Sequence, residues 1–114
     1  MALSGSGRKR KGARNELRVL HYLEEKGYTC TKAGGSLGAW DIIAIAPHRI
    51  LLIQVKSNRP PSGAEMDILD GFKCPQVEHV RKLVVVVMDG EPVARAVTFP
   101  PDRRSERACL LELV

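Results

Sequence analysis

Residues 41–56 read DIIAIAPHRILLIQVK, and they contain two apolar runs separated by a short break. The runs are Asp41–Ala46 and Ile50–Lys56, and the break is Pro47-His48. Short apolar runs on either side of a tight turn are typical of an antiparallel β-hairpin. We therefore predict a hairpin at the centre of the fold.

The open end of this hairpin is polar. A two-residue turn pairs Ala46 with Arg49, and the same register puts Asp41 opposite Gln54, with their Cβ atoms about 5 Å apart. Strand alternation then gathers Asp41, Gln54 and Lys56 on one face. The pattern predicts a site at the strand ends, and the alternative is that these polar ends simply extend into solvent.

The segment before the hairpin predicts a helix over residues 11–26, ended by Gly27. Its apolar residues recur at helical spacing: Leu17, Val19, Leu20 and Leu23. On a helical wheel Glu16 falls in the middle of this apolar face, where a carboxylate is costly unless it is paired or bound to a metal. The alternative is a solvated first-turn glutamate that the helix dipole favours.

The remaining segments predict a mixed α/β sheet flanked by helices, in the order α-β-β-β-α-β with extra C-terminal strands. A capping box at Ser62 and Glu65 predicts a helix to about Asp70, and Pro75 predicts a second helix through Lys82. The expected further strands are Tyr28–Lys32, Leu83–Met88, Val93–Phe99 and Ala108–Val114, with a glycine-rich loop over 33–39 and a turn at Asp89-Gly90.

Composition and charge limit the classes of protein to which the chain can belong. A chain of 114 residues with 44% hydrophobic and 27% charged residues is expected to form one globular domain. The net charge of +5 arises within the first fourteen residues, which hold five basic residues and no acid. We predict a flexible basic arm over 1–11 that binds phosphate, followed by one domain over 12–114; the alternative is a solubilising tail.

No apolar stretch reaches the roughly 20 residues of a membrane helix, so no membrane partner and a cytoplasmic location are expected. The three cysteines, Cys30, Cys74 and Cys109, fit neither a disulfide framework nor paired zinc ligands. We expect reduced thiols.

Four short motifs carry a resemblance to a known family: Arg14-Asn-Glu16, Gly34-Gly-Ser36, Trp40-Asp41 and Gln54-Val-Lys56. In this order and spacing they resemble the PD-(D/E)XK nuclease superfamily, and within it the archaeal-type Holliday junction resolvases, over roughly residues 8–58. The third motif is a QxK variant. The resemblance implies a restriction-endonuclease-like core and metal-assisted phosphodiester hydrolysis.

The resemblance also implies roles for particular residues. Asp41, Gln54 and the Val55 carbonyl would hold Mg²⁺ (Mn²⁺ is the alternative ion), with Glu16 as a further or water-mediated ligand. Lys56 would position the nucleophile or neutralise developing charge, and Ser36 would lie near the scissile phosphate. Gln54 stands where the family usually has an acid, so weaker Mg²⁺ binding is expected.

We expect the protein to be a structure-specific endodeoxyribonuclease. The main expectation is a Holliday junction resolvase of DNA recombination and repair, which acts as a homodimer on four-way junctions. The alternatives are another nuclease of the superfamily and a catalytically weak DNA-binding module. Trp40 and Phe72 fit either a DNA contact or the core. The predicted DNA-binding residues are Arg8, Lys9, Arg10, Lys11, Arg14, Lys32 and Arg59.

Overall fold

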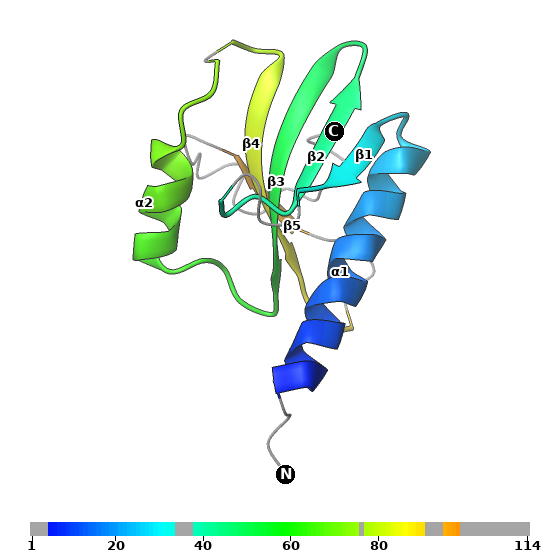
Figure 1. Ribbon diagram of the computed structural model, residues 1–114, viewed down its shortest axis with the longest axis vertical. Helices are drawn as coiled ribbons and strands as arrows, with labels where there is room; N and C mark the ends of the chain where they lie inside the picture. The colour runs from blue at the N-terminus through cyan, green and yellow to red at the C-terminus, as the bar shows by residue number, and fades with distance from the viewer. Residues whose placement is uncertain (1–4, 34–37, 76, 91–94, 99–114) are drawn as a thin grey trace.

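The computed structural model describes residues 5–33, 38–75, 77–90 and 95–98 (Figure 1). Its elements, in chain order, are α1 (Gly5–Glu25), β1 (Thr29–Lys32), β2 (Ile42–Ala46), β3 (Arg49–Ser57), α2 (Gly63–Gly71), β4 (Val80–Val87) and β5 (Arg95–Thr98). Across this part of the chain the strands form one sheet in the order β1-β2-β3-β4-β5. Only the β3–β4 pair is parallel in the sheet as described, so the sheet is mixed, as predicted.

The central hairpin has the predicted register. Ala46 pairs with Arg49 and Ile42 pairs with Ile53, so the connection is the expected two-residue turn. The strand pairing ends at Ile42, one residue short of Asp41, whose backbone N–H still donates to the Ile53 carbonyl at 2.8 Å. Strand β2 therefore begins directly after Asp41, which carries one of the predicted site carboxylates.

Helix α1 covers one face of the sheet and α2 covers the other (Figure 1). On the α1 side, Val19 and Leu23 pack on the odd-numbered residues of β3, Leu51 and Ile53, all four being buried. Burying each of these side chains contributes about 1.5–3 kcal/mol, which makes this face the main source of α1 stability. The packing also fixes which residues of α1 point at the sheet.

Helix α2 is attached at both of its ends. Ser62 caps its N-terminus in a complete capping box with Glu65, as the sequence predicted. At its C-terminus the Lys82 ammonium, carried by β4, donates to the last carbonyls of the helix and the residue after it: Leu69, Asp70 and Phe72. The helix is thus held against the sheet over a second core that contains Trp40, Leu52 and Leu69.

Two expectations about element boundaries are wrong. The helix predicted from Pro75 to Lys82 is absent among the residues described there; 77–79 form a turn and β4 begins at Val80. Val80 pairs with Ile50, and parallel pairing along the whole of β3 overrides the local helix signal. Helix α1 begins at Gly5, six residues before the predicted start, so residues 5–11 are helical. The division into a mobile arm and a domain stays a prediction.

The other expected elements are either confirmed or lie in residues that the structure does not describe. β4 is buried from Leu83 to Val87, β5 lies inside the predicted Val93–Phe99 segment, and Ala108–Val114 lies outside the described residues. Cys30 and Cys74 are free thiols, and Cys109 is not among the residues described. Within the described chain, helices long and apolar enough to span a membrane are absent.

Candidate active site

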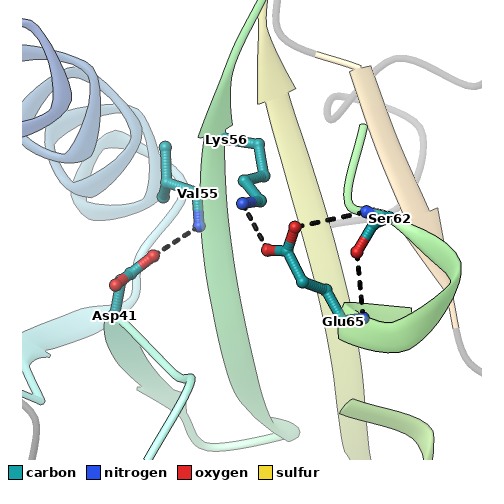
Figure 2. A network of polar contacts seen from close by, with 5 residues as sticks. All are labelled: Asp41, Val55, Lys56, Ser62 and Glu65. Atoms are coloured by element: carbon teal, nitrogen blue, oxygen red, sulfur yellow. Dashed lines mark hydrogen bonds and ion pairs between the residues drawn. The ribbon is translucent and has the colours of Figure 1, made fainter. Parts of the chain in front are cut away.

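The Asp41 carboxylate is fixed at the open end of the hairpin (Figure 2). Its Oδ2 accepts a hydrogen bond of 2.8 Å from the Val55 backbone N–H. The Asp41 backbone is held as well, because its N–H donates to Ile53 and its carbonyl accepts from the Ala33 N–H at 2.9 Å. A side chain held this way needs little reorganisation to act on a bound group.

A second carboxylate, Glu16 on α1, lies near enough to interact with Asp41 electrostatically. Burial raises the pKa of Glu16, the negative charge of Asp41 raises it further, and the charge of Lys32 lowers it. Burial also raises the pKa of Asp41, against the lowering effects of the Val55 hydrogen bond and the Lys56 charge. Two half-buried carboxylates that repel each other form a region that favours a cation.

Gln54 presents an unpartnered oxygen at the same strand end. It lies two residues before Lys56, so alternation gives the two side chains the same face of β3. Its Oε1 atom is buried and has no hydrogen-bond partner among the described residues. A buried acceptor without a donor is uncommon and indicates a missing partner.

These oxygens fit a hard divalent cation. Mg²⁺ prefers carboxylate and carbonyl oxygens, which Asp41, Glu16 and Gln54 provide. The described residues contain no group of three or more His, Cys, Asp or Glu side chains arranged for a metal. A cation bound here would therefore need the Gln54 amide oxygen or a backbone carbonyl, such as that of Val55, in addition to the two acids.

The Lys56 ammonium points away from the hairpin edge toward the first turn of α2 (Figure 2). There it forms an ion pair with the Glu65 carboxylate. It still lies within electrostatic range of Asp41, whose pKa it lowers. Lys56 is therefore flanked by Asp41 on one side of β3 and by Glu65 on the other.

Asn15 joins the helix that bears Glu16 to the strand that bears Lys56. Its Nδ2 atom donates to the Ser57 Oγ at 2.6 Å, and Asn15 is 7% exposed. Sequence reasoning included Asn15 in a motif but gave it no role, and it missed Ser57. The signal was the position of Asn15 next to the apolar stripe of the helix; its partner lies 42 residues away and has no sequence signature.

The other predicted residues divide into three groups. Arg14 in the middle of α1, Lys32 at the end of β1 and Arg59 just after β3 are all exposed. Ser36 lies outside the described residues, and so do the side chains of residues 8–11. Trp40 is 1% exposed and packs edge-to-face on Phe72, with ring centroids 5.7 Å apart, so both belong to the core.

The mixed sheet with a helix on each face is the fold of the PD-(D/E)XK-type nucleases. The family model for "Archaeal holliday junction resolvase (hjc)" matches residues 7–64, half of the chain. The chain belongs to the archaeal Holliday junction resolvase family, and its activity is that of a Holliday junction resolvase nuclease.

A solved structure gives the same fold. The 1.6 Å structure of Archaeoglobus fulgidus Hjc, described as a Holliday junction resolvase from an archaeal hyperthermophile, superposes with a TM-score of 0.68 at 19% sequence identity. The match covers 90% of this chain and 94% of the other. No curated protein matches this sequence. Nucleases of this family are typically metal-dependent, and their substrates are branched DNA.

Proposed function

We propose that the protein is a Mg²⁺-dependent endonuclease that cuts four-way DNA junctions, with its reaction centre at the end of β2 and β3. The observation that carries this proposal is the Asp41 carboxylate, which the Val55 N–H fixes and which lies within electrostatic range of Glu16 and Lys56. Strand β3 also carries the buried, unpartnered oxygen of Gln54. Mn²⁺ offers the same chemistry to these oxygen ligands.

Each residue has a proposed role in the reaction. Asp41, Gln54, the Val55 carbonyl and Glu16 would hold the cation, which would supply Lewis-acid activation of water and of the phosphate. The Lys56 ammonium stabilises the negative charge that develops on the phosphate oxygens. Ser36, in the glycine-rich sequence before Asp41, would contact the scissile phosphate.

DNA is held largely through phosphate contacts, which give affinity without sequence readout. The predicted contacts are Arg8, Lys9, Arg10, Lys11, Arg14, Lys32 and Arg59. Of these residues, Lys32 lies within electrostatic range of Glu16. A DNA substrate is also the reason to expect a cytoplasmic location.

The resolving unit is a homodimer. Resolution of a four-way junction into two duplexes takes two symmetric nicks, and one chain carries one set of Glu16, Asp41, Gln54 and Lys56. Two chains related by a two-fold axis match the symmetry of the junction. Sedimentation at micromolar concentration should report twice the mass of one chain, and a strict monomer both free and on junction DNA would contradict the dimer.

Incubation with a labelled four-way junction and with a linear duplex, each with and without Mg²⁺, tests the function. Cleavage of the junction alone, and only with Mg²⁺, is the expected result. The neutral Gln54 supports a second candidate, a DNA-binding module with weak catalysis, for which the junction would be bound and cut only slowly at every Mg²⁺ concentration.

A further inference from the structure

The face of β3 that carries Lys56 lacks the acid that would normally accompany it on the strand. Gln54 precedes Lys56 by two residues on the same face and is neutral. The carboxylate in contact with the Lys56 ammonium comes instead from Glu65, in the first turn of α2 (Figure 2). Within the described residues, the ion pair recorded for Lys56 is with Glu65.

Both oxygens of the Glu65 carboxylate are engaged. Oε2 pairs with the Lys56 ammonium, while Oε1 accepts from the Ser62 N–H at 3.3 Å. The Glu65 N–H in turn donates to the Ser62 Oγ at 3.2 Å. With the other end of α2 held by Lys82, the Glu65 carboxylate is fixed relative to the sheet.

We propose that Glu65 is a positioning residue for Lys56: its carboxylate holds the ammonium at the end of β3 and supplies, from α2, the negative charge that Gln54 does not. The inference rests on the proposed function, because it assumes that Lys56 acts on the phosphate. A long, flexible lysine whose ammonium is paired with Glu65 samples fewer positions, which favours the reactive geometry.

The positioning role can be separated from a structural one. The Lys56 and Glu65 side chains are 28% and 40% exposed, and ion pairs this exposed contribute little to stability. A capping box accepts Gln in place of Glu at its third helical position. Glu65→Gln should therefore keep the start of α2 intact while it removes the charge next to Lys56.

The first experiment compares Glu65→Gln with Ser62→Ala under single-turnover conditions at saturating Mg²⁺. Glu65→Gln should lower the cleavage rate about tenfold, with the junction Kd and the Tm near their wild-type values. The matched control Ser62→Ala, which breaks the capping box and keeps the ion pair, should lower the Tm and leave the rate within twofold. A wild-type rate for Glu65→Gln, or an equal rate loss in Ser62→Ala, would overturn the proposal.

The second experiment moves the charge back to the strand. In a Gln54→Glu background, Glu65→Gln should cost less than twofold, because a carboxylate already lies beside Lys56. A purely structural role for Glu65 predicts the same tenfold loss in both backgrounds, and that result would reject the positioning role. If Lys56→Ala cleaves like wild type, the proposed function fails instead, so the two failures are distinguishable.

Discussion

Replacement of Asn15 by Ala should loosen the attachment of α1 to the end of β3. The buried Asn15 amide donates to the Ser57 Oγ at 2.6 Å, and the net contribution of one such hydrogen bond is about 0.5–1.5 kcal/mol. With the small loss of packing, we expect the free energy of unfolding to fall by about 1–2 kcal/mol. For a domain of this size that lowers the Tm by about 5–10 °C.

Substitution of Ser57 removes the other half of the same hydrogen bond. Ser57→Ala leaves the buried Asn15 amide without an acceptor and should cost about 1–3 kcal/mol, at least as much as Asn15→Ala. The double variant should cost less than the sum, by about 1 kcal/mol, because the two residues share one interaction. Thermal and urea denaturation of the four proteins measures this coupling.

The same variants test the site. Because Asn15 precedes Glu16, its loss should let Glu16 move relative to Lys56, so the single-turnover rate should fall several-fold at temperatures where the variant is folded. Junction binding should stay unchanged. Strict additivity of the two stability effects, or an Asn15→Ala protein with wild-type Tm and rate, would refute the claim that this bond couples helix and strand.

Three further predictions concern the proposed function. Asp41→Asn and Lys56→Ala should each remove cleavage in a junction assay while gel-shift affinity stays within a few-fold, and wild-type cutting by Asp41→Asn would disprove the site. Gln54→Glu should stay active and reach half-maximal rate at lower Mg²⁺, because it adds a ligand charge; a higher requirement would show that Gln54 is not a ligand. Deletion of residues 1–11 should flatten the slope of log affinity against log salt by up to about four and keep the preference for branched DNA, whereas an unchanged slope would identify the arm as a solubility tail.

Local patterns predicted the centre of the fold well. The hairpin register follows from a two-residue turn between two apolar runs, and Ala46 pairs with Arg49 as expected. The capping box at Ser62 and Glu65 also follows from local chemistry. By contrast, the helix expected after Pro75 failed because β4 is determined by its parallel pairing with β3, about 30 residues earlier in the chain, and short-range patterns carry no information on such contacts.

The candidate site was predicted only in part for the same reason. Alternation along the hairpin predicts that Asp41, Gln54 and Lys56 share one face, because all three belong to one local unit, and this grouping stays a prediction. The Asn15–Ser57 hydrogen bond and the Lys56–Glu65 ion pair each join separate elements. In the sequence, the capping box alone accounts for a glutamate at position 65. The pattern therefore gives no sign that Glu65 also pairs with Lys56.

The position of the site at the strand ends follows from how a strand presents its side chains. Within the sheet, odd residues of β3 such as Ile53 face α1 and even residues such as Leu52 face α2, so groups from the two helices are kept apart. At the end of the hairpin both helices contribute: Glu16 from α1 interacts with Asp41, and Glu65 from α2 pairs with Lys56. The Lys56 charge in turn lowers the pKa of Asp41. The site therefore depends on both helical layers, and detaching α1 or α2 from the sheet should abolish cleavage before the whole domain unfolds.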